Sequence, residues 1–223
     1  SVATAFAFTR NSEVPPSRLT SVLLKSDDAI AFIETESQSH FDSEPGTREG
    51  DAMNPGGDIL GRCFELAGAG DLDAAGDLAE LALADEGDNG PLWRFVGLLR
   101  NRSGDHAGAS DALATAQALV PLDPTASCAL AESLARTGRS VPACMVYQAL
   151  ATDGRCPEGL MPAIAAGLGF LGEFEQALDV CVELIRRRPD HAEAHFGAAF
   201  YLRRLGRPLE TAMAYVARAH ALA

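Results

Sequence analysis

The sequence has little lysine, few aromatic residues and no long hydrophobic run. Lys25 is the only lysine, and one residue of the 223 is tryptophan. No stretch approaches the roughly 18 uninterrupted apolar residues of a membrane-spanning helix. The first residues, SVATAFAFTRNSE, lack the basic-then-apolar layout of a secretory signal. If they are the natural start of the protein, we expect a cytoplasmic chain without a membrane-inserted segment.

An excess of positive charge is also missing. The chain carries 18 basic and 31 acidic residues, a formal net charge of −13. Because binding to phosphates requires a basic face, this balance argues against a nucleic-acid partner. The acids are concentrated towards the N-terminal half, which predicts an uneven surface potential able to orient a partner.

The five cysteines lack the spacings that bind metals or form a disulfide framework. They show no C-x-x-C pair. An odd number in a chain of this size is typical of reduced thiols that are mostly buried. Cys128 is the one that we expect to be partly exposed, and nothing near it in the sequence would lower its pKa. We therefore predict structural thiols and no metal.

Sequence motifs for catalysis or cofactor binding are weak. GLGFLG at 167–172 has dinucleotide-binding spacing but lies where a helix, not a strand-to-helix turn, is expected. His191 and His195 in HAEAH are one helical turn apart, without an H-E-x-x-H pattern or an evident third ligand. No phosphate-binding loop or nucleophile motif appears. We predict no catalytic residues, no cofactor and no enzyme activity.

A period of 34 residues organises the chain after about residue 56. Helix-like segments flank glycines that recur without a slip. They are Gly70, Gly104, Gly138, Gly172 and Gly206. The pattern predicts helix, glycine turn and helix, repeated five times.

Other positions repeat with the same period. Seven residues before each glycine the side chain is small, in Cys63, Gly97, Ala131, Ala165 and Ala199. Five residues after it stand Ala75, Ala109, Ala143 and Ala177, with Thr211 in the fifth copy. Small residues let the two helices of a pair approach closely. Pro121 and Pro189 fall where second helices should end, since proline cannot continue a helix.

This pattern resembles the tetratricopeptide repeat (TPR). The resemblance implies an all-α fold, a right-handed α-solenoid of about five helix pairs, near 56–89, 90–123, 124–157, 158–191 and 192–223. Residues 1–55 would form an irregular, partly flexible arm. Its apolar segments could pack into the groove of the solenoid or cap its first repeat. The last helix has no polar cap after it, so dimerisation through that end is also expected.

In TPR domains the first helices line a concave groove that binds peptides. Carried over by position, the resemblance implies a partner-binding surface of aromatic, leucine and arginine side chains with a few other polar residues. These are Phe64, Arg94, Phe95, Leu98, Asn101, Arg102, Glu132, Arg136, Phe170, Phe196, Phe200, Arg203 and Arg204. Arginine and aromatic residues are enriched at binding hot spots, and arginine suits carboxylates. We expect a protein or peptide ligand with acidic and apolar side chains.

Three functions follow from this sequence. The first is an adaptor or scaffold that binds a peptide or partner subunit in its groove. The second is a secretion-type chaperone that shields an export substrate. A metal- or cofactor-dependent enzyme is the remote third. One use of the TPR groove is disfavoured, because the asparagine position of chaperone-tail clamps holds Phe64, Leu98, Glu132, Ala166 and Phe200.

Overall fold

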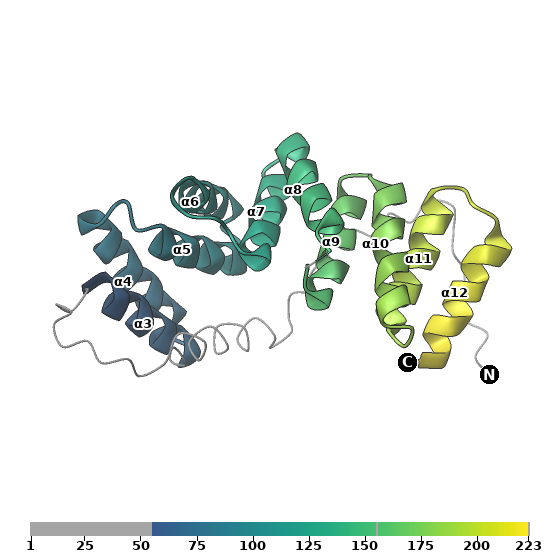
Figure 1. Cartoon of the computed structure of the whole chain (residues 1–223), viewed down its shortest axis with the longest axis horizontal. Coiled ribbons are helices and arrows are strands. Elements are labelled where there is room, and N and C mark those ends of the chain that lie inside the picture. Colours follow the sequence, from purple (N-terminus) through teal and green to yellow (C-terminus); the bar gives the residue numbers. More distant parts are fainter. Residues whose placement is uncertain (1–54, 155, 223) are drawn as a thin grey trace.

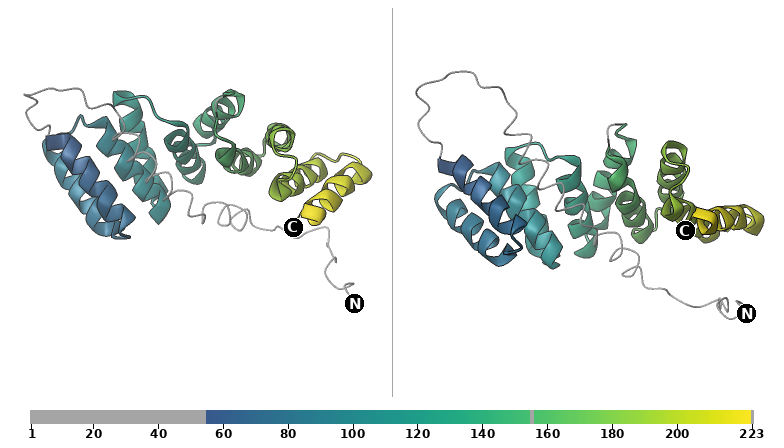
Figure 2. Two further views of the ribbon diagram at one scale, coloured as in Figure 1. Left: turned by 60° about the horizontal axis from the view of Figure 1, so that its bottom comes forward. Right: turned by 90° about the horizontal axis from the view of Figure 1, so that it is seen from below.

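The computed structural model describes the backbone of residues 55–154 and 156–222. It describes their side chains from residue 59 onwards. This part of the chain is all-α and forms a solenoid of five helix pairs in one arched row (Figure 1). The same row is seen from two further directions in Figure 2. The expected N-terminal arm, with its packing into the groove or against the first repeat, falls on residues 1–54 and so lies outside the described residues.

The helices alternate between a first and a second member of each pair. The first helices are α3 (Pro55–Gly68), α5 (Gly90–Ser103), α7 (Pro124–Arg136), α9 (Met161–Phe170) and α11 (Ala192–Arg204). The second helices are α4 (Leu72–Asp85), α6 (His106–Leu119), α8 (Ser140–Thr152), α10 (Phe174–Arg187) and α12 (Leu209–Leu222). A 3₁₀ turn, η1 (Glu158–Leu160), precedes the short helix α9. Figure 1 places α6 and α8 above α5, α7 and α9.

Each of the five periodic glycines has a positive φ, between 67° and 88°. Residues with a Cβ rarely adopt this conformation, and it ends a helix sharply. In four repeats the residue after the glycine donates its N–H to the carbonyl of the periodic leucine four residues before the glycine, as Arg139 does to Leu134 at 2.8 Å. In the second repeat Arg100 occupies the leucine position, and its carbonyl accepts from Ser103 Oγ at 3.0 Å.

The small periodic residues lie between the two helices of a pair, as predicted. Ala75, Ala109, Ala143 and Ala177 are completely buried. A Cβ added to Gly97 would come within 2.5 Å of Leu113. The predicted ends of α6 and α10 are also confirmed, because their C-cap residues, Val120 and Arg188, stand directly before the two prolines.

The fifth repeat departs from the predicted register. Thr211 is exposed, and Ala212 is the buried small residue. In the second and fourth repeats, His106 and Phe174 donate their N–H to the turn glycine's carbonyl. Pro208 stands at this position in the fifth repeat, and α12 begins one residue later. The shift brings Ala212 to the helical position that Ala177 has in α10.

Two glycines of GLGFLG have a packing role. A Cβ on Gly167 would lie 2.2 Å from Tyr147, and one on Gly169 would lie 2.6 Å from Tyr201. The rings of these tyrosines therefore close on α9 from α8 and α11. Tyr201 Oη also donates to the Ala165 carbonyl at 2.8 Å. This motif is part of the solenoid's core, not a dinucleotide site.

We expect the substitution Gly138→Ala to lower the free energy of unfolding by about 1–2 kcal/mol, because alanine is strained at positive φ. Nothing lies within 4 Å of a Cβ at this position, so the cost is conformational. Gly159→Ala in η1 is the matched control, since that position is equally open and has no positive φ. Urea denaturation followed by circular dichroism measures both. An equal loss in the two variants would contradict the role given to the turn.

Candidate functional site: the first-helix face

The exposed side chains of α5, α7, α9 and α11 form what we call the first-helix face. These four helices contain six arginines and two glutamates. Aromatic side chains are exposed beside them: Phe170 by 39%, Phe196 by 52% and Phe200 by 37%. The face therefore combines positive charge with accessible aromatic surface.

Two of the predicted ligand residues connect neighbouring repeats. Arg94 forms an ion pair with Asp123, with 2.8 Å between Nη1 and Oδ2. Asp123 also caps α7 by accepting from the backbone N–H groups of Thr125 and Ala126. Asn101 donates to Ser133 Oγ at 2.9 Å and to the Ala129 carbonyl at 3.3 Å. These contacts fix α5 against α7.

In the N-terminal repeats, the predicted aromatic residues belong mainly to the core. Phe95 is 3% exposed, and its ring meets the half-buried Phe64 ring edge-on at a centroid distance of 5.1 Å. The expectation that Phe95 reaches the groove is thus wrong, because its side chain fills the space between the first two repeats. Leu98 is half-buried and packs on the core, whereas Arg102 is exposed.

In the C-terminal repeats, arginines lie over aromatic rings. The Arg136 guanidinium is 5.4 Å from the Phe170 ring centroid, and Arg204 is 4.7 Å from that of Phe174. Glu132 reaches Arg136 at 3.7 Å. Such stacking holds a guanidinium in place.

Helix α11 contributes two of the three exposed phenylalanines named above. Phe196 and Phe200 are one helical turn apart and lie on the same side of the helix. Phe200 also packs edge-on against Tyr201, 5.3 Å between ring centroids. Arg203 and Arg204 follow in the last turn and are exposed. An aromatic pair next to two arginines is thus concentrated at the end of one helix.

The sequence did not single out Phe174, the aromatic support of Arg204. It lies two residues after a turn glycine, where the other repeats have Leu72, His106, Ser140 and Pro208. Because no aromatic residue recurs at that position, the repeat pattern gave no signal for it. Only the packing of α10 against α11 brings its ring under the arginine.

The two histidines of HAEAH have structural partners. His191 Nδ1 accepts from the Ala194 N–H and caps α11. His195 Nε2 lies 3.0 Å from the Pro189 carbonyl, just as Trp93 Nε1 donates to the Gly87 carbonyl at 2.8 Å in the second repeat. Within residues 55–154 and 156–222, no three His, Cys, Asp or Glu side chains form a cluster that could hold a metal.

The cysteines are mostly buried. Cys128 is 8% exposed, so the expectation that it is partly exposed on the groove side is wrong. Burial raises the pKa of Cys128 and of Cys181 to about 12. Cys144 is half-buried and is the most accessible thiol among the described residues.

A thiol reagent should therefore modify Cys144 first in the native protein. Only the thiolate reacts, so buried groups with a raised pKa react slowly. Iodoacetamide labelling at pH 8 followed by peptide mass spectrometry measures the order. Labelling in urea is the control, in which all five cysteines should react alike. Native-state labelling of Cys128 or Cys181 ahead of Cys144 would contradict the packing of α7 and α10.

No protein-family model matches the sequence, and no curated protein matches it. Solved structures do match, and one of them is described as a TPR protein. YrrB, described as a TPR protein with an unusual peptide-binding site, is 15% identical with a TM-score of 0.65. That match covers 74% of this chain and 84% of YrrB.

MamA proteins share the fold to a similar extent. MamA from Desulfovibrio magneticus is 16% identical with a TM-score of 0.64, over 78% of this chain and 97% of that one. A MamA structure labelled AMB-1 is 19% identical with a TM-score of 0.63, over 74% and 96% of the two chains. The chain thus has a TPR-type fold. In the part of the chain that the structure covers, no helix is long and apolar enough to cross a membrane.

Proposed function

We propose that this protein is a non-enzymatic adaptor that binds a segment of another protein on its first-helix face. The observation that carries the proposal is the joint exposure of arginine and phenylalanine on α11. The ligand would be a peptide or partner subunit with carboxylates and apolar side chains. YrrB, with a similar fold, is described as having a peptide-binding site, which supports a ligand of this class.

In this proposal the residues of the face have two different roles. Arg94 and Asn101 have partners in the next repeat and would act mainly by keeping α5 and α7 in register. Arg136, Phe170, Phe196, Phe200, Arg203 and Arg204 would contact the ligand. Apolar side chains of the ligand would cover the phenylalanine rings, and its carboxylates would accept from the guanidinium groups.

The double substitution Phe200→Ala with Arg204→Ala should weaken ligand binding by about 30–900-fold, since two contact side chains at about 1–2 kcal/mol each remove about 2–4 kcal/mol of binding free energy. Affinity capture with the full chain, read by mass spectrometry, identifies the ligand. Titration calorimetry with the captured protein then measures the affinity. Binding should also weaken as salt is raised, because arginine–carboxylate attraction is screened.

A matched control removes the same kinds of side chain elsewhere. Leu81→Ala with Arg139→Ala deletes an exposed apolar residue and an exposed arginine at second helices. This variant should bind as the unmodified chain does. Equal affinity of all three proteins would show that the ligand site is not on α11. Capture of a nucleic acid or a small metabolite in place of a protein would contradict the proposed ligand class.

A further inference from the structure

Four exposed side chains form a row across the first-helix face. Each stands two residues before a turn glycine, so all four have the same place at the end of their helix. They are Arg102 in α5, Arg136 in α7, Phe170 in α9 and Arg204 in α11. We call these residues the end row. Along the solenoid it presents two arginines, a phenylalanine and a third arginine in a fixed order.

The four helices that carry the end row contact one another directly. Asn101 of α5 donates to Ser133 Oγ of α7 at 2.9 Å. The guanidinium of Arg136 in α7 lies 5.4 Å from the ring centroid of Phe170 in α9. Tyr201 of α11 donates to a backbone carbonyl of α9 at 2.8 Å. Because the axes of helices in contact are about 8–10 Å apart, each step along the row has about this length.

A polyproline II helix matches this step. It rises about 3.1 Å per residue with three residues per turn, so every third side chain points the same way after about 9.3 Å. A β-strand covers a similar distance in three residues, but its side chains alternate and residues three apart point to opposite faces. An α-helix advances about 5.4 Å per turn and matches the step only at every second turn. A polyproline II segment therefore places one side chain on each repeat.

The helices of the first-helix face place few acids near the end row. Glu132 lies beneath it, 14% exposed at the side chain, and reaches Arg136 at 3.7 Å. Glu193 is in the first turn of α11, at the opposite end of that helix from Arg204. Arg203 adds a further exposed positive charge beside Arg204. The row thus offers more positive than negative charge, with an aromatic ring between its arginines.

The turns beside the end row add no net charge. From the second repeat to the fifth, the residues directly after the turn glycines are Asp105, Arg139, Glu173 and Arg207. Asp105 caps α6, and Arg207 forms an ion pair with Glu175 at 2.7 Å. The positive charge along this line therefore comes from the arginines at the ends of the first helices.

We propose that the end row binds a polyproline II segment of the ligand, with acidic, acidic, apolar and acidic side chains at every third residue, in this order or its reverse. This assignment rests on the proposed adaptor function and names the pattern that its ligand carries. The carboxylates accept from Arg102, Arg136 and Arg204, and the apolar side chain covers Phe170. Proline suits the residues in between, because it favours this backbone conformation.

The first experiment varies only the spacing. Fluorescein-labelled peptides of identical length and composition contain three glutamates and one leucine among prolines, placed two, three or four residues apart. Each is made in both orders, since the row does not fix the direction of the ligand chain. Fluorescence anisotropy with the full chain measures the affinity. The better order of the three-residue spacing should bind about tenfold or more tightly than the other spacings, because it alone puts all four side chains on one side.

A second experiment locates the ends of this peptide. Arg102→Ala and Arg204→Ala should each weaken its binding by about 5–10-fold. Replacing the glutamate opposite either arginine by glutamine should have a similar effect. Both changes together should weaken binding no more than one alone, because they remove the same contact. Arg218→Ala removes an exposed arginine of α12 and is the matched control, which should leave the affinity unchanged.

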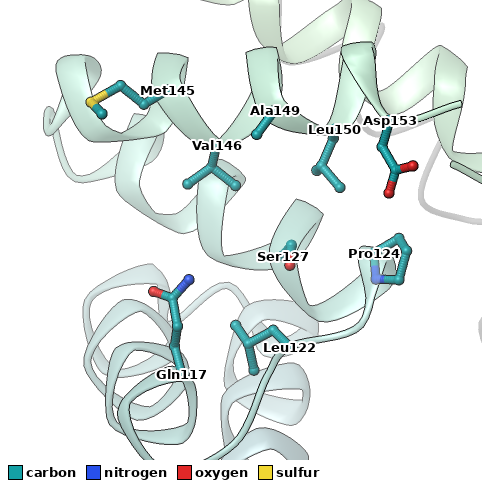
Figure 3. Close-up of a pocket in the computed structure, with 9 residues that line it drawn as sticks. All are labelled: Gln117, Leu122, Pro124, Ser127, Met145, Val146, Ala149, Leu150 and Asp153. Atoms are coloured by element: carbon teal, nitrogen blue, oxygen red, sulfur yellow. The ribbon is translucent and has the colours of Figure 1, made fainter. Parts of the chain in front are cut away.

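A groove of about 600 Å³ beside α8 is the competing place for a peptide (Figure 3). No residue of the end row lines it, and Met145 and Ala149 lie opposite Gln117 across its opening. Its one charged lining residue is an acid, Asp153. The groove therefore lacks the cations that this ligand needs, and Met145→Ala should not change the affinity for the three-residue spacing.

Equal affinity for the three spacings would overturn the proposal, since it would mean diffuse attraction to the arginines. Independent, additive effects of each arginine and its glutamate would do so too. The same holds for a loss of binding through Met145→Ala, or for no binding of either three-residue order at about 100 μM protein. The adaptor function is tested separately. It fails if the captured ligand binds the Phe200→Ala with Arg204→Ala variant as tightly as the unmodified chain, whatever the proline peptides do.

Discussion

The solenoid depends on a glycine with a left-handed backbone conformation at the end of each first helix. The chain must reverse within two or three residues for the second helix to pack back on the first, and positive φ at these five positions allows this. Small residues at the crossing, such as Ala143 and Gly97, then let the two helix axes come close. One helix pair buries little apolar surface alone, and stacking against the next pair supplies the missing core.

Stacking also produces two chemically different surfaces. The five first helices carry seven arginines and four acids. The second helices carry nine acids and three arginines. Because one face gathers the first helices and the other the second, a charge difference spread along the sequence becomes a difference between opposite sides of the molecule.

Some of the residues predicted to bind a ligand have structural roles. Arg94 and Asn101 stand at positions that the TPR resemblance assigns to ligand contact, yet their side chains bind Asp123 and Ser133 of the next repeat. Phe95 is core. The sequence could not separate these cases from Arg204 or Phe200, because helical position gives the direction of a side chain but not what the neighbouring repeat places opposite it.

The sequence by itself determined the repeat length, the all-α fold and the turn positions, since each rests on local geometry that glycine, proline and small residues impose. It also determined that the basic residues are almost all arginine. The tertiary structure decided which side chains remain accessible. It moved the buried small residue of the last repeat from Thr211 to Ala212, in a helix that begins one residue later than the other second helices. It also buried Cys128 and placed Phe174 beneath Arg204. These outcomes depend on contacts between repeats, which no single 34-residue unit encodes.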